Sequence, residues 1–383
     1  DLYYVTQLQG HPEQTYEKMI GRPNFAKLYR EKEEAVWQAW LYLPCVLIDE
    51  INRLPPGKQT ELLKALESGM ADYLNNTIWL GKKKVFATAN YRDAGNVGLI
   101  PPLIDRIGAV IEIGYIGSYF HEDIEEAEKK IANELIDREL TQMVMNTLKS
   151  EKSYKEKIAT MDKARERFQQ KLKTRFDNLL TKEDIEKLKE EILGLELSQD
   201  ADIFWRCIQA EINRTKTYGL KRRVDIRDEE SHNQALANYK TVNALSYRGA
   251  KAIKNFAKGI AYLMGADKVD KKHIVTIAPY ILAHRIEFTQ DFRSKHETDR
   301  RSESFEIYLA EKLIEGVESN FKTAYKDLQI LYWYVKDKSK LDVMKRKRAE
   351  DMLKNPQNID HPLILDIVER YRYEEWRNQE AEE

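Results

Sequence analysis

Short apolar runs alternate with helix-like patterns over the first part of the chain, up to about residue 116. The candidate strands are residues 3–8, 45–48, 84–89 and 109–113, and the helix-like stretches between them include residues 32–43 and 57–68. Pro55-Pro56 precedes the second stretch, where proline is tolerated because the first N–H groups of a helix lack partners. Apolar strands that alternate with helices predict an α/β fold with a buried parallel sheet.

The pattern changes after residue 118. Residues 121–197 are rich in Glu, Lys, Arg and Gln, and their apolar residues fall at helical spacing, as in Ile124, Ala127 and Ile131. This pattern predicts long charged helices, arranged as an antiparallel hairpin. Two interpretations remain open: a solvated insertion that packs only on itself, and an arm that binds a partner.

Shorter helices with ordinary apolar faces are expected over residues 200–288. They include a helix at 250–264, with Gly265 as its C-terminal cap, and a helix that starts near Asp270. The remainder is helical and charged. We therefore expect four parts: a core at 1–118, a charged helical insertion at 119–200, a helical domain at 201–290 and a helical extension at 291–383.

Composition narrows the class of protein. The chain has 383 residues, of which 33% are charged, and a formal net charge of -1. A balanced charge does not favour binding to nucleic acid or to an anionic membrane. Cys45 and Cys207 are too few and too far apart for a disulfide framework, which indicates a reducing, cytoplasmic location. No apolar run is long enough to span a bilayer, and no secretory signal is present.

Two acidic residues follow the candidate strand at 45–48. Ligands of open α/β sheets bind at the carboxyl ends of the strands, where Asp49 and Glu50 stand. One carboxylate there can hold Mg²⁺, which prefers oxygen ligands and keeps several waters, and the next can activate a water for attack on a phosphate. The alternative is a buried strand that ends in two solvated acids.

Three further residues are candidates for the same chemistry. Asn90 ends the next strand and could orient the attacking water, although asparagine is also a common turn residue. Arg106 is expected on a short helix before the last strand, where it is either a surface ion pair or an arginine that reaches a neighbouring subunit. Arg248 opens a later helix and could fold back over phosphates, or it is a surface residue.

The order and spacing of these residues resemble the Walker B, sensor 1, arginine finger and sensor 2 series of the AAA+ superfamily. More narrowly, the chain is similar to the MoxR group, which is related to magnesium chelatase ATPases. The resemblance covers residues 1–116 and 240–288. It rests on Asp49-Glu50-Ile51-Asn52-Arg53 with Pro55-Pro56, Ala87-Thr88-Ala89-Asn90, Leu103-Ile104-Asp105-Arg106, Leu245-Ser246-Tyr247-Arg248 and His284-Arg285.

This resemblance implies a P-loop-type sheet with a helical lid, and ATP hydrolysis with Mg²⁺ at the subunit interfaces of a hexameric ring. Asp49 would hold Mg²⁺, Glu50 would activate water and Asn90 would position it. Arg106 would act on the neighbour's nucleotide, and Arg248 would contact the nucleotide from the lid. The output would be chaperone-like remodelling of a client, or metal insertion into a partner protein.

The sequence departs from the family pattern in three places. It contains no Gly-x-x-x-x-Gly-Lys-Ser/Thr, the loop whose backbone N–H groups cradle phosphates. Because the chain starts within a strand-like stretch, we expect that this loop precedes Asp1 in the native protein. The lid motif has Tyr247 where the family has proline, and the charged segment lengthens the region before Arg248.

Two other functions remain open: an inactive AAA+ scaffold without a P-loop, and an AAA+ motor that acts on DNA. The basic runs at 221–223 and 345–348 could contact phosphates, but nearby acids favour solvated faces. Tyr332-Trp333-Tyr334 is interpreted as helix packing rather than a base-stacking surface. The seven histidines show no metal-ligand spacing.

Overall fold

A computed structural model describes residues 5–90, 97–114, 116–135, 137–174, 176, 179–214, 234–299, 304–356 and 361–382. These residues divide into two compact units. The N-terminal unit contains residues up to 104 and residues 116–181, and the C-terminal unit contains residues 105–114 and those from 182 onward. The two units do not follow the four expected parts, because the charged segment contributes to both.

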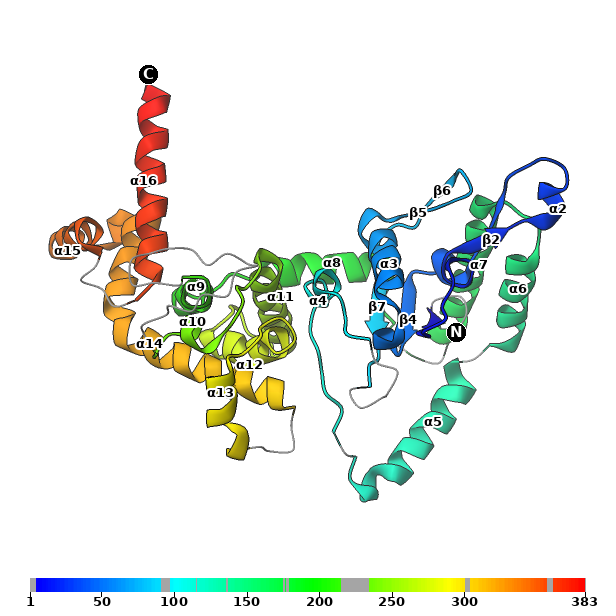
Figure 1. Ribbon diagram of the computed structural model, residues 1–383, viewed down its shortest axis with the longest axis horizontal. Helices are drawn as coiled ribbons and strands as arrows, with labels where there is room; N and C mark the ends of the chain where they lie inside the picture. The colour runs from blue at the N-terminus through cyan, green and yellow to red at the C-terminus, as the bar shows by residue number, and fades with distance from the viewer. Residues whose placement is uncertain are drawn as a thin grey trace. The chain divides into compact units, whose positions relative to one another are not determined.

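A parallel sheet organises the N-terminal unit (Figure 1). Its strand order is β1 (Val5–Gln9), β4 (Cys45–Asp49) and β7 (Lys84–Ala87), with Gln9 opposite Asp49 in the register. The central strand buries Val46 and Ile48 completely. Helix α3 (Pro56–Ser68) begins with proline as expected and packs Leu62 and Leu63 into the same core.

Other short elements surround this sheet. Among the described residues, two further antiparallel strand pairs are present, β2 with β3 and β5 with β6. The remaining elements of this region are α1 (Tyr16–Met19), β2 (Gly21–Pro23), α2 (Phe25–Leu28), β3 (Ala35–Trp37), η1 (Ala39–Tyr42), η2 (Ile51–Arg53), β5 (Met70–Tyr73), β6 (Asn76–Trp79) and α4 (Pro101–Ile104).

Three details of the predicted core are wrong. Residues 32–43 are not one helix, because β3 pairs with β2 and η1 follows it. β7 is exposed rather than buried, with Phe86 at 62% exposure, because in the described part of the chain it pairs with a strand on one side only. Residues 109–113 are described throughout and form no strand.

The third error has a physical reason. A β-branched run such as 109–113 becomes a strand when a neighbouring strand accepts its backbone hydrogen bonds. Here the segment belongs to the C-terminal unit, and the Val110 N–H donates to the Tyr280 carbonyl of a helix. Ile111 and Ile113 remain 75% and 84% exposed.

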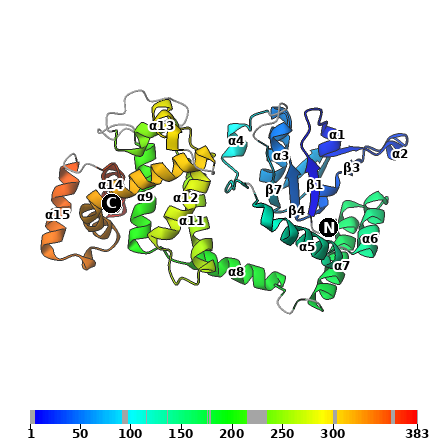
Figure 2. The same ribbon diagram turned by 90° about the horizontal axis from the view of Figure 1, so that it is seen from below.

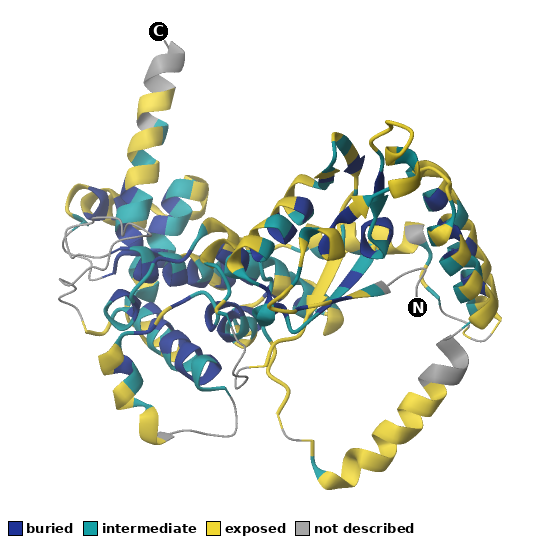
Figure 3. Cartoon of the chain, turned by 45° about the vertical axis from the view of Figure 1, so that its right-hand side comes forward, coloured by how far each residue is buried: buried dark blue, intermediate teal, exposed yellow. Residues whose placement is uncertain are grey.

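The charged segment is helical, as predicted. It comprises η3 (Ser118–Phe120), α5 (His121–Leu135), α6 (Arg138–Lys149), α7 (Tyr154–Lys173) and α8 (Lys182–Gly194). Helices α6 and α7 lie side by side (Figure 2) and pack against Tyr42 and Leu43, so this pair does not pack only on itself. The side chains of residues 121–130 on α5 are all exposed (Figure 3).

The C-terminal unit is helical and has one large core. Helices α9 (Gln199–Asn213), α11 (Tyr247–Leu263), α12 (Lys271–Leu282) and α14 (Phe305–Lys336) supply most of that core. Gly265 follows α11 with φ 66°, as its predicted capping role requires. The other elements are α10 (Ala237–Lys240), α13 (Gln290–Lys295), η4 (Glu297–Asp299), η5 (Lys338–Lys340), α15 (Val343–Lys354) and α16 (Leu363–Glu382).

Two further predictions concern the end of the chain. Tyr334 is buried on α14, and Trp333 donates from its indole N–H to Gln199, so the aromatic cluster does serve helix packing. Residues 345–348 are exposed on α15, as a solvated face would be, whereas the basic run at 221–223 lies outside the described residues. In the described part of the chain, no helix is both long and apolar enough to cross a membrane.

Candidate functional site

The two acidic residues lie at the carboxyl edge of the parallel sheet. Asp49 is the last residue of β4, and Glu50 follows it with φ 52° and ψ 49°, the left-handed conformation. A residue other than glycine in this conformation stores roughly 1–3 kcal/mol of strain, and such residues concentrate at functional sites. The turn places the Asp49 and Glu50 carboxylates beside the ends of both neighbouring strands.

Thr88, directly after β7, connects the two acids. Its hydroxyl accepts a hydrogen bond from the Glu50 N–H at 3.0 Å and donates one to the Asp49 carboxylate. The Thr88 carbonyl accepts from the Ile51 N–H at 3.0 Å, which fixes the backbone on the far side of Glu50. On its other side, Asp49 accepts a bond of 3.0 Å from the Gln7 amide of β1.

Three donors surround the Glu50 carboxylate. The Asn90 amide lies 3.3 Å from Oε1, and the Gln9 amide lies 3.2 Å from Oε2. Arg53, three residues further along the chain, forms an ion pair with Oε2 at 3.1 Å. Asn90 is itself held through its carbonyl, which accepts from the Asn52 amide at 2.9 Å. The structure therefore brings Asp49, Glu50 and Asn90 together at one edge of the sheet.

Gly10 allows β1 to approach this edge closely. Its N–H donates to the Asp49 carbonyl at 2.7 Å. A Cβ atom on Gly10 would lie 2.1 Å from the Glu50 carbonyl oxygen, far inside van der Waals contact. Any larger side chain at position 10 would push the β1 end away from Glu50.

The two candidate arginines belong to the C-terminal unit. Arg106 lies in a turn after α4 rather than on the short helix predicted for it, since α4 ends at Ile104. Arg248 is in the first turn of α11 and forms an ion pair of 3.2 Å with Asp105, the residue before Arg106. Asp105 thus joins the segment of Arg106 to the helix of Arg248.

Sequence reasoning missed Gln7, Gln9 and the role of Thr88. Gln7 and Gln9 are polar residues at alternate positions of β1, a strand of a sheet that was predicted to be apolar. That alternation was the available signal, because residues i and i+2 of a strand share one face. Their partners depended on the pairing of β1 with β4, which the sequence pattern does not specify.

The acidic edge fits Mg²⁺ by its chemistry. Mg²⁺ is usually bound by one or two carboxylates, with waters and substrate phosphates as its other ligands. Asp49 and Glu50 supply two carboxylates, and the Thr88 hydroxyl adds a third oxygen beside them. Within the described ranges, no group of three or more His, Cys, Asp or Glu residues could hold a metal ion.

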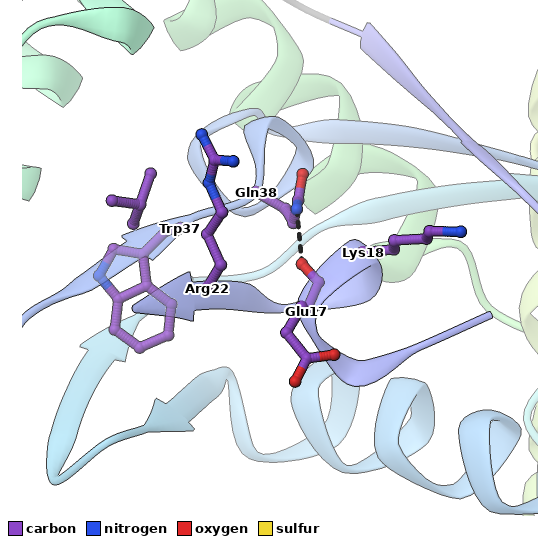
Figure 4. A pocket seen from close by; sticks show the side chains of 6 residues that line it. Glu17, Lys18, Arg22, Trp37 and Gln38 are labelled. Atoms are coloured by element: carbon purple, nitrogen blue, oxygen red, sulfur yellow. Dashed lines mark hydrogen bonds between the residues drawn. The ribbon is translucent and has the colours of Figure 1, made fainter. Parts of the chain in front are cut away.

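A separate hollow of about 300 Å³ lies between α1, β2 and β3 (Figure 4). It is lined by Glu17, Lys18, Arg22, Val36, Trp37 and Gln38. The Gln38 amide, just after β3, donates to the Glu17 carbonyl of α1 at 2.7 Å. None of the predicted site residues lines this hollow.

Comparisons with known proteins concern the lid region and the fold, not the residues of the acidic edge. Residues 236–304 match the family model of the AAA lid domain. The fold is similar to that of a candidate ATPase from Cytophaga hutchinsonii, with a TM-score of 0.50, 17% identity, and coverage of 82% of this chain and 76% of that one. At this identity the likeness concerns the fold alone. Among curated proteins, no sequence matches the chain.

Proposed function

We propose that this chain, whose residues 236–304 match the AAA lid domain, is the hydrolytic and lid portion of an AAA+ ATPase of the MoxR type. The observation that carries the proposal is the acidic edge of the sheet. Glu50, in a left-handed backbone conformation, has the Asn90 amide 3.3 Å from its carboxylate and Asp49 beside it. A carboxylate beside an amide donor supports the proposal, because such a pair can hold and activate a water next to a phosphate.

The residues divide the work of hydrolysis as follows. Glu50 accepts the proton of the attacking water. The Asn90 amide, which lies beside Oε1 of Glu50, orients that water. Thr88 and Gln7 hold the Asp49 carboxylate in place. Mg²⁺, held through Asp49, would neutralise charge on the phosphates of ATP.

The proposal extends to the assembly. Arg106 acts on nucleotide bound by the neighbouring subunit of a hexameric ring, and Arg248 contacts nucleotide from the lid of its own subunit. Hydrolysis then drives remodelling of a protein client, or metal insertion into one. The exposed charged helix α5 is available for such a partner.

The test is an ATPase assay of the full-length native protein. Because a general base contributes about 10²–10⁴-fold in rate, Glu50→Gln should lower kcat by that order while ATP still binds. Glu61→Gln, on α3 in the same unit and outside the acidic edge, is the matched control and should hydrolyse ATP normally.

Two results would contradict the proposal. Normal hydrolysis by Glu50→Gln would remove Glu50 as the base. Absence of both ATP binding and hydrolysis in the full-length wild type would favour an inactive scaffold. Adding DNA to the same assay tests the motor alternative, which requires stimulation that weakens steeply with salt.

A further inference from the structure

The segment Asp105–Gly108 is neither helix nor strand, so its backbone carbonyls need partners from elsewhere. Arg285, just after α12, supplies them. Its guanidinium donates to the carbonyls of Gly108 at 3.2 Å and Asp105 at 3.3 Å, and to that of Ile107. A fourth bond, of 2.9 Å, reaches the Ile281 carbonyl of α12. One side chain thus fastens three carbonyls of this segment to the helix.

His284 adds a second attachment. Its Nε2 lies 3.1 Å from the Ile107 carbonyl oxygen. Burial lowers the pKa of His284 to about 4, and the neighbouring Arg285 charge acts in the same direction. The imidazole is therefore neutral at physiological pH, and the charge at this attachment belongs to Arg285. Burial also lowers the pKa of Arg285, with Asp105 acting in the opposite direction.

The Asp105 carboxylate completes the connection to α11. It accepts from the hydroxyl of Ser246, the N-cap of that helix, and pairs with Arg248 at 3.2 Å. The start of α11 also packs tightly on Arg285, since a Cβ on Gly249 would lie 3.1 Å from the Arg285 Cδ atom. Two residues at the start of α11 and two just after α12 therefore hold Asp105–Gly108, namely Ser246, Arg248, His284 and Arg285.

We propose that Arg285 is a positioning residue for Arg106, and that Asp105 couples Arg106 to Arg248. This inference rests on the proposed function, in which Arg106 acts on the neighbour's nucleotide and Arg248 on its own. Because Arg106 lies within the gripped segment, movement of α11 and α12 moves the backbone that carries it. Nucleotide contact at Arg248 then adjusts the arginine presented to the next subunit.

The chemistry requires arginine at position 285. A guanidinium has five N–H donors in a planar fork and can serve several carbonyls at once, whereas a lysine ammonium is a compact point charge with three. Arg285→Lys keeps the charge but cannot reproduce the fork. Since a misplacement of about 1 Å can cost on the order of 10²-fold in rate, we expect a loss of kcat of that order with little change in KM.

The control is Arg293→Lys. Arg293 lies on α13 of the same unit and uses its fork on Glu306, at 3.0 and 2.6 Å, away from Asp105–Gly108. Arg293→Lys also loses the planar guanidinium, and it should hydrolyse ATP normally. A thermal unfolding curve of each variant checks that the fold is intact. If Arg285→Lys does not fold, His284→Gln replaces it in every assay.

Mixed assemblies of full-length subunits distinguish two possibilities. Arg285 could position Arg106 for the neighbouring subunit's site, or it could act only on the site of its own subunit. A subunit with Arg285→Lys has a complete site of its own but presents a misplaced Arg106. Mixing it with Glu50→Gln subunits, which present a correct Arg106, should restore hydrolysis above the average of the two separate proteins. Mixing it with Arg106→Ala subunits should restore nothing, because both present a defective arginine.

The reverse pattern would overturn the inference. If Arg285 acts only on its own subunit's site, the mixture with Arg106→Ala gains activity and the mixture with Glu50→Gln does not. Normal hydrolysis by Arg285→Lys alone, or no gain in either mixture, would also refute it. Failure of the proposed function looks different: Glu50→Gln and Arg106→Ala would then hydrolyse ATP like the wild type, and this inference would fall with it.

Discussion

At the scale of single residues, the acidic edge depends on close backbone approaches as much as on carboxylates. The left-handed Glu50 and the next residue, Ile51, each donate a backbone N–H to Thr88, and Gly10 lies close to the Glu50 carbonyl. Strain at one residue persists only where its surroundings determine the conformation. Here the surroundings are β1 and the residue that follows β7.

Gly10→Ala tests this contact. Its Cβ would overlap the Glu50 carbonyl oxygen, so we expect about 1–3 kcal/mol of destabilisation, the usual cost of overpacking, together with reduced ATP hydrolysis. Gly57→Ala in the first turn of α3 meets nothing within 4 Å and should be neutral, or stabilising by up to about 1 kcal/mol. Urea unfolding measures both, and equal effects of the two changes would show that the contact is absent.

Between elements, a buried polar connection in the C-terminal unit joins the end of α9 to α16. Arg214, only 2% exposed, pairs with Asp366 and Glu369 of α16. Nearby, Glu211 is fully buried and accepts from Asn320 of α14 at 3.0 Å and from the Ala237 N–H. His361 Nδ1 accepts from the Leu363 N–H, so its Nε2 is the nitrogen that donates to Glu211. Helices α10, α14 and α16 therefore all contact the C-terminal end of α9, through Glu211 and the capping residue Arg214.

Arg214→Met measures the connection between these helices. The two partner carboxylates are 42% and 50% exposed and can regain water, so we expect about 2 kcal/mol of destabilisation, less than the 3–5 kcal/mol for a wholly buried pair. Arg206→Met is the control, because Arg206 is half exposed and pairs with Asp202 on the same helix, a contact worth under about 1 kcal/mol. Urea denaturation that ranks Arg206 above Arg214 would contradict this view.

At the scale of the whole molecule, the described residues form two units with separate main cores. Leu62 of α3 is fully buried in the first core, and Ile253 of α11 is fully buried in the second. The site residues follow the same division, since Asp49, Glu50 and Asn90 belong to one unit and Arg106 and Arg248 to the other.

Separate cores predict local effects of core mutations. Leu62→Ala should cost about 2–5 kcal/mol and reduce hydrogen-exchange protection in α3 and β4, while α11 and α12 keep theirs. Ile253→Ala should produce the opposite pattern at similar cost. Loss of protection throughout the chain in either variant would show that the two cores unfold as one.

The sequence alone determined which polar residues lie at or just after the strand ends. Asp49 ends β4 and Glu50 follows it, whereas β7 ends at Ala87 and Asn90 lies three residues further on, not at the end of the strand as predicted. These residues meet because the carboxyl ends of parallel strands share one edge. The sequence also predicted the proline at the start of α3 and the capping role of Gly265 after α11, because local backbone geometry depends on local residues.

Tertiary structure decided the rest. Gln7 and Gln9 became partners of the two acids through the register of β1 on β4, a pairing between segments about 40 residues apart. Residues 109–113 have a strand-like pattern, yet Arg285 and His284 attach the segment before them to α12, and no strand forms. The local pattern of a segment shows which secondary structure that segment could form. Its hydrogen bonds depend on the element that lies beside it in the fold, and the local pattern does not specify that element.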